Sequence, residues 1–87
     1  MTDGRESLLE FPCDLAVKVF GRNDPGFRAA VLAIVEAHFG SAYSVAEQRS
    51  KQGSYSSLTV TVRVESRAQA DAVYAALVAH ELVLMAL

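Results

Sequence analysis

The segment Leu58–Glu65 reads LTVTVRVE, and every second residue in it is a branched apolar one. This period of two is typical of a β-strand that buries one face. The segment Leu15–Phe20 repeats the pattern, with Leu15, Val17 and Val19 on one side. A chain with two such strands has to cover an apolar sheet face with a second layer.

Two segments with helical periodicity can supply that layer. The first follows Asp24-Pro25-Gly26 and is expected to end near Phe39, before Gly40, since Asp24 is a suitable N-cap and proline fits the first helical position. The second follows Ser66, where Ser66-Arg67-Ala68-Gln69 matches a capping box. The expected inner stripes, at helical spacing, are Phe27, Ala30, Val31, Ile34 and His38 in the first helix and Ala70, Val73, Ala76, Leu77 and His80 in the second.

Two further strands complete the expected sheet. Tyr43–Ser50 alternates in a polar manner, as edge strands do, and the turn Lys51–Ser54 follows it with Gly53 available for a positive φ. Val83–Leu87 is short and apolar on both faces. The order β-α-β-β-α-β predicts an α+β ferredoxin-like two-layer sandwich, with a four-stranded antiparallel sheet and two helices on one face.

The length of the chain limits the number of domains, and its net charge limits the classes of partner. The chain has 87 residues, so we expect residues 1–12 to be a partly ordered lead-in and residues 13–87 to form one domain. The net charge is −2 at pH 7, which argues against nucleic acid or an anionic membrane as the main partner. No apolar run approaches the roughly 18 residues that span a bilayer. The N-terminal segment has no apolar run long enough for a signal peptide, so we expect a cytoplasmic protein.

Several segments resemble the YbeD-like family of small bacterial proteins, and the resemblance covers the chain from about Leu8. The most specific of them is Leu8–Asp14, which reads LLEFPCD. The others are Val17–Gly21, Val35–His38, Gly53–Tyr55 before Thr59–Val62, and Tyr74–Leu77 leading to His80. The resemblance implies an ACT-like form of the ferredoxin fold without an established activity, and a loose link to lipoate metabolism.

The loop Asn23–Phe27 is similar to the strand-to-helix loop of ACT regulatory domains, which lies near their amino-acid site. This likeness implies that the Gly21–Gly26 turn contacts a small polar metabolite, with Asn23 and Asp24 as side-chain ligands. The turn would then bind an anionic group at the helix N-terminus. The same Asp-Pro-Gly also arises simply as the start of a helix, so a purely structural role for Gly21, Asn23, Asp24 and Gly26 is the alternative.

An acylphosphatase-type phosphoryl hydrolase is the enzymatic alternative, because that enzyme shares the topology. The stretch from Gly21 to Arg28 faintly resembles its phosphate-binding loop, in which backbone amides and an arginine hold a phosphoryl group. The loop is one residue short, however, and Pro25 removes an amide. Asn23 is the chain's only asparagine, so no later strand supplies one to position water.

No catalytic residue, metal site or cofactor is predicted. Cys13 is the only cysteine, which excludes an internal disulfide, and Asp14 beside it disfavours a reactive thiolate. We expect Cys13 to be buried and inert. His38 and His80 are expected to close their helices by bonding last-turn carbonyls.

The outer face of the predicted sheet and its edge strand are the surfaces that a partner could cover. The expected positions on the outer face are Ala16, Lys18, Phe20, Thr59, Thr61 and Arg63, which offer too few aromatic residues for an RNA-recognition surface. The apolar strand Val83–Leu87 lies at an edge and needs a cover. Either the N-terminal Leu8–Phe11 segment or a second chain, identical or different, would supply it.

If a second chain covers the edge strand, we expect Ala16, Phe20 and Met85 to form the partner surface. The predicted function is therefore that of a non-enzymatic, ACT-like regulatory or adaptor domain. It would bind a small metabolite or a partner protein, and a homodimer is one form that this binding could take.

Overall fold

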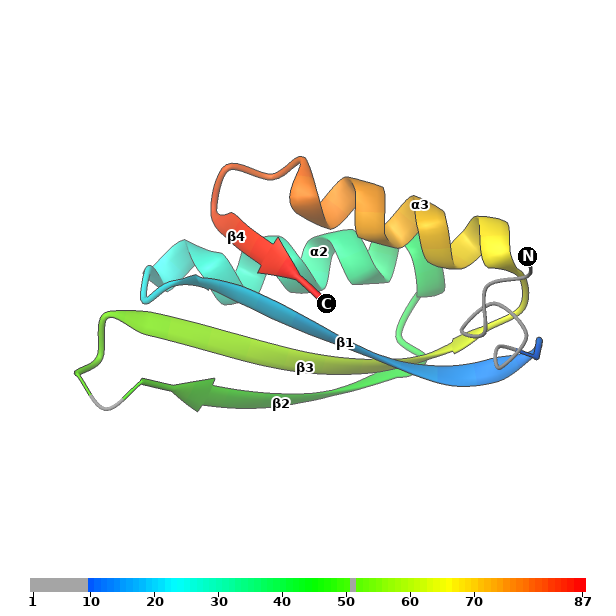
Figure 1. The fold of residues 1–87 in the computed structure, drawn as a ribbon, viewed down its shortest axis with the longest axis horizontal. Coiled ribbons are helices and arrows are strands. Elements are labelled where there is room, and N and C mark those ends of the chain that lie inside the picture. Colours follow the sequence, from blue (N-terminus) through cyan, green and yellow to red (C-terminus); the bar gives the residue numbers. More distant parts are fainter. Residues whose placement is uncertain (1–9, 51) are drawn as a thin grey trace, which may run out of the picture.

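A computed structural model describes residues 10–50 and 52–87. Its elements are β1 (Cys13–Arg22), α2 (Pro25–Phe39), β2 (Tyr43–Arg49), β3 (Tyr55–Val64), α3 (Arg67–Val78) and β4 (Val83–Ala86). The sheet has the order β2-β3-β1-β4 and is antiparallel throughout, with both helices on one face (Figure 1). The predicted ferredoxin-like architecture is confirmed.

The core lies between the sheet and the two helices. The period-two pattern places Val17 directly opposite Val60, and Val19 opposite Leu58, in the two central strands. The fully or nearly buried apolar residues are Val17, Val19, Leu58, Val60, Val62, Val64 and Val83 from strands, and Phe27, Val31, Val35, Ala70, Val73 and Leu77 from helices. Val35 is a core residue that the predicted stripe of the first helix omitted.

Both predicted N-caps are present. The Asp24 carboxylate accepts the amide of Gly26 at 2.7 Å, and the Ser66 hydroxyl accepts the amide of Gln69 at 3.2 Å. In a capping box the side chain of Gln69 would accept the backbone amide of Ser66. Here it accepts the amide of the preceding residue, Glu65, at 2.8 Å. The β1–β3 ladder ends at the pair Cys13 and Val64, so the Glu65 amide lies beyond it and is free for Gln69.

The two histidines differ in their roles. His38 Nδ1 lies 2.9 Å from the carbonyl oxygen of Ile34, so the histidine contacts a helix carbonyl as predicted, but in the turn before the last one. The prediction for His80 is wrong, because α3 ends at Val78 and His80 lies in the following turn. There its Nδ1 accepts the amide of Leu82 at 3.1 Å and so holds the connection to β4.

Strand β4 lies at the sheet edge beside β1, as expected. Phe20 is opposite Met85, and the register shifts between Phe20 and Gly21. Lys18 and Leu87 exchange two backbone hydrogen bonds of 2.9 and 2.8 Å, which extend the pairing. None of the described helices is long and apolar enough to cross a membrane.

The predicted N-terminal lead-in falls mostly outside the described residues, which begin at Glu10. Phe11 packs against the core just before Cys13, whereas β4 pairs with the other end of β1. Residues 8 and 9 lie outside the described residues, so the cover that they were expected to give β4 stays a prediction.

Tyr43, the first residue of β2, is joined to the last turns of α2 by a hydrogen bond. Its hydroxyl donates to Glu36 Oε2 at 2.6 Å. This bond, together with desolvation and the charge of Glu36, raises the pKa of Tyr43 above its ordinary value of 10.0, while Arg28 opposes the shift. Burial alone raises the pKa of Tyr74.

Glu36→Ala should therefore lower the pKa of Tyr43 and leave that of Tyr74 unchanged. Because the folded-state pKa of Tyr43 is raised, its contribution to stability is present below pH 10.0 and is lost as the pH rises through the folded pKa. Phenolate absorbance of variants that retain one tyrosine each measures both values. A Tyr43 pKa that Glu36→Ala leaves unchanged would contradict the assignment.

Candidate functional site

The turn between β1 and α2 contains the residues predicted to bind a metabolite. Asn23 donates its side-chain amide to the carbonyl oxygen of Gly53 at 2.8 Å, and its backbone amide to that of Ser54 at 3.0 Å. Both bonds join the turn to the connection between β2 and β3, where Gly53 has the positive φ expected of it, +72°. The backbone amide and one side-chain N–H of Asn23 are thus engaged within the chain.

The other residues of this turn also have structural roles. Asp24 caps α2 through the bond to Gly26 described above. Gly21 is buried, and a Cβ there would lie 2.6 Å from the carbonyl oxygen of Leu82 and against the ring of Phe27. A Cβ on Gly26 would lie 3.2 Å from Asp24 Oδ1. The structure thus accounts for all four residues without a ligand, and their role in metabolite binding stays a prediction.

The arginine of the acylphosphatase alternative is also engaged. Arg28 Nη1 lies 2.8 Å from Glu47 Oε1, and this ion pair joins the first turn of α2 to β2. Arg49 Nε lies 3.6 Å from the second oxygen of the same carboxylate. A phosphoryl group at this turn would have to compete with Glu47 for Arg28.

Other reactive groups form no cluster in the described structure. Cys13 is partly buried rather than buried as predicted, because it begins β1 at the end of the sheet. Within residues 10–50 and 52–87, no group of three His, Cys, Asp or Glu residues is placed to hold a metal ion.

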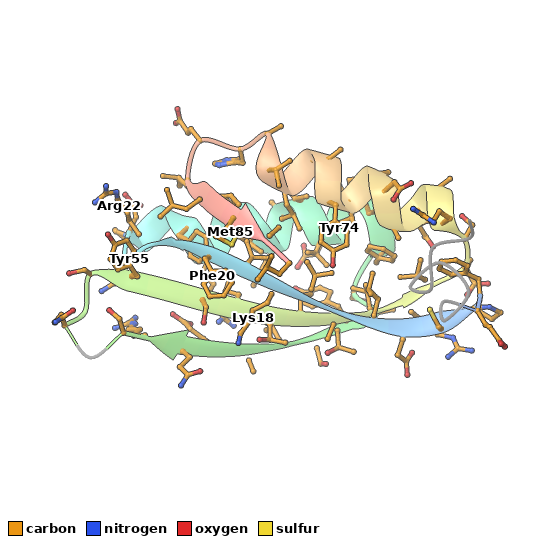
Figure 2. All side chains as sticks on the ribbon, in the orientation of Figure 1. Lys18, Phe20, Arg22, Tyr55, Tyr74 and Met85 are labelled. Carbon is orange, nitrogen blue, oxygen red and sulfur yellow. The ribbon has the colours of Figure 1, made fainter. Side chains whose placement is uncertain are left out.

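The sheet face away from the helices carries the predicted partner surface. Phe20 lies between Met85 on β4 and Ser57 on β3 (Figure 2). The exposed fractions of Leu84, Met85 and Leu87 are 56%, 50% and 62%, which is unusual for large apolar side chains. We call these three residues with Phe20 the edge patch.

Ala16 lies beside the edge patch rather than within it. It is exposed and opposite Thr61, but the pairing of β4 with β1 extends only to Lys18 and Leu87. In the described part of the chain, no strand pairs with the outer edge of β4.

A hollow of about 390 Å³ opens on the same face, on the other side of Phe20. Its lining consists of Lys18, Phe20, Gln48, Arg49, Ser50, Tyr55, Ser56 and Ser57. Lys18 Nζ lies 5.8 Å from the centroid of the Phe20 ring, a cation–π distance. Tyr55 and Phe20 lie toward the end of the sheet where β2 turns into β3 (Figure 2). We call this site the hairpin hollow.

A third strand that begins at Leu58, as the sequence predicts, leaves Tyr55 outside the sheet and gives no sign of the hairpin hollow. In the structure β3 begins at Tyr55, which pairs with Arg22. Tyr55-Ser56-Ser57 does continue the alternation in polar form, since Ser56 is buried and both neighbours are more exposed. This polar alternation is the sequence signal that places Tyr55 on the open face.

Comparisons with known proteins give a consistent result. Residues 6–87 match the family model described as "Protein of unknown function (DUF493)". A UPF0250 protein of Paraburkholderia phytofirmans is 40% identical over 85 residues, covering 95% of this chain and 96% of the relative. One from Neisseria gonorrhoeae is 41% identical over 83 residues, covering 93% and 91%.

A solved structure shows the same fold. The solution structure of protein HP0495 from H. pylori aligns with a TM-score of 0.78 and covers 91% of this chain and 85% of that one. The sequence identity is 14%, so the likeness concerns the fold alone.

The capping role of Asp24 can be separated from a role of its charge. Asp24→Ala should lower the free energy of unfolding by about 1 kcal/mol, because the Gly26 amide loses its acceptor. Asp24→Asn should change it little, because asparagine caps helices about as well as aspartate. Urea unfolding of both variants measures the difference. An equal loss in both would assign the effect to the charge instead.

Proposed function

Since this chain belongs to the DUF493 family, whose curated relatives are named UPF0250, we propose that it is a non-enzymatic regulatory or adaptor domain that binds a partner protein in the cytoplasm. This is the YbeD-like family that Leu8–Asp14 indicated. The observation that carries the proposal is the exposed apolar strand β4 at the edge of the sheet.

An edge strand of this kind is suited to binding another chain. Its outward backbone N–H and C=O groups can accept an additional strand, and Leu84, Met85 and Leu87 supply apolar surface around it. Phe20, half-buried beside Met85, extends that surface onto β1. We therefore propose that the partner contributes an extended segment that lies along β4 and covers the edge patch.

A different protein is a better occupant than a second copy of this chain. Strand β4 has four residues, so two copies paired edge to edge would bring together only two short strands. Stable interfaces commonly bury about 800 Å² per partner, and four residues supply little of that area. A segment from a different protein can also extend over Phe20 and the neighbouring open face, which two β4 strands paired edge to edge would leave uncovered.

The metabolite-binding form of the hypothesis has less support. The backbone amide and one side-chain N–H of Asn23, one carboxylate oxygen of Asp24 and the space around Gly21 are used within the chain. A ligand that bound through these same groups would have to displace these contacts. The edge patch requires no such displacement, because its apolar side chains are already exposed.

A photocrosslinking amino acid in place of Met85 should give a discrete adduct with one partner protein in native lysate. The same amino acid in place of Ala72, which is exposed on α3, should not. Met85→Lys should reduce recovery of that partner at least fivefold without unfolding the domain, since half of the Met85 surface is exposed. Mass spectrometry identifies the adduct and circular dichroism checks the fold.

Two results would contradict this assignment. Equal adducts from positions 85 and 72 would show that no surface is preferred. An adduct of twice the chain mass, with a dimer in sedimentation that Met85→Lys dissociates, would replace the partner protein by a second copy.

Acyl-phosphate turnover by the pure protein distinguishes the enzymatic alternative. We expect no sustained hydrolysis, because Arg28 is paired with Glu47 and Pro25 removes an amide from the loop. Hydrolysis that Arg28→Ala abolishes and Arg63→Ala preserves would overturn the non-enzymatic proposal. Arg63 is the control because it lies on the open face, paired with Asp14 at 3.4 Å.

A further inference from the structure

The arginines and lysines of the described residues fall into two groups. Arg28, Arg49, Arg63 and Arg67 each lie within 4.0 Å of a carboxylate oxygen. In the same part of the chain, Lys18 and Arg22 have no carboxylate within that distance. Both lie on β1 at alternate positions, so they share the open face with Phe20 between them.

The two unpaired cations lie beside the two aromatic rings of the hairpin hollow. Lys18 lines the hollow and contacts the Phe20 ring, and Arg22 is directly opposite Tyr55. Figure 2 shows Arg22 and Tyr55 together at this end of the sheet. Positive charge therefore gathers here on a chain whose net charge is −2.

The lining of the hollow contains no carboxylate. Arg49 also lines the hollow, but it lies opposite the buried Ser56, on the helix side of the sheet, where it is near the Glu47 carboxylate that Arg28 binds. Lys18 is therefore the cation that the lining presents on the open face. The remaining polar groups are neutral. The Ser50 hydroxyl accepts the amide of Tyr55 at 3.2 Å and keeps its own proton to donate.

We propose that the hairpin hollow binds a small organic anion with a flat apolar body, such as an aromatic carboxylate. Its charge would pair with Lys18, and its ring would lie against Phe20 and Tyr55. The volume of about 390 Å³ is within the range of small-molecule sites. A bound metal cation is disfavoured, because the lining offers no carboxylate ligand.

This inference goes beyond the proposed function and does not rest on it. The partner segment is expected along β4, whereas the anion would lie over β1, β3 and the end of β2. Phe20 is the residue common to the edge patch and the hairpin hollow. No other residue is shared, so a substitution away from Phe20 can disable one site while binding at the other is tested.

The test uses 2-naphthoate as the probe and uncharged 2-naphthamide as its matched control. Titration of isotope-labelled protein should shift the backbone amides of Lys18, Phe20, Tyr55 and Ser57 at millimolar naphthoate. Naphthamide should bind about fivefold more weakly, because it lacks the charge that pairs with Lys18.

Variants separate the local charge from the overall charge. Lys18→Gln should weaken naphthoate binding about fivefold, and Tyr55→Ala should weaken it further by removing a ring. Arg63→Gln removes the same charge at the far end of the open face and should leave affinity unchanged. Met85→Gln, which adds no charge beside Phe20, should also leave it unchanged, which separates this site from the edge patch.

Three results would overturn the proposal. One is the absence of amide shifts at millimolar naphthoate. Another is equal binding of naphthoate and naphthamide, which would show a merely apolar contact. The third is a set of shifts confined to Leu84–Leu87, which would place the probe on the edge patch.

Discussion

The antiparallel pairing of β1 with β3 is the interaction on which the rest of this structure depends. It extends without interruption from Cys13 opposite Val64 to Arg22 opposite Tyr55. Because side chains alternate along a strand, this register directs Val17 and Val19 to the helices and leaves Phe20 on the open face. A slip of one residue would exchange the two faces.

The end of β1 shows how tightly this frame is connected. Gly21 lets the strand approach Phe27 of α2 and the carbonyl of Leu82, and Asn23 bonds to the turn between β2 and β3. Three connections of the chain therefore meet at one end of the sheet. Residues that look available for a ligand in the sequence are here committed to holding those connections together.

The sheet face under the helices is buried in the core, so the surface of the sheet that another molecule can reach is the open face and its edge. Phe20 occupies the middle of that region, with Met85 on one side and the hairpin hollow on the other. The apolar edge suits a protein segment, while the cations of the hollow suit a small anion.

The sequence by itself determined the order of elements, the two N-caps and most of the core, because periodicity and caps depend on neighbours a few residues apart. It also determined that Phe20 and Met85 lie at an apolar edge. Only the tertiary structure decided that Asn23 bonds to Gly53, 30 residues away, and that Arg28 pairs with Glu47, 19 residues away. The hairpin hollow likewise depends on the register that places Phe20 and Gln48 on either side of Ser57, and no local pattern encodes a register between strands so far apart in the chain.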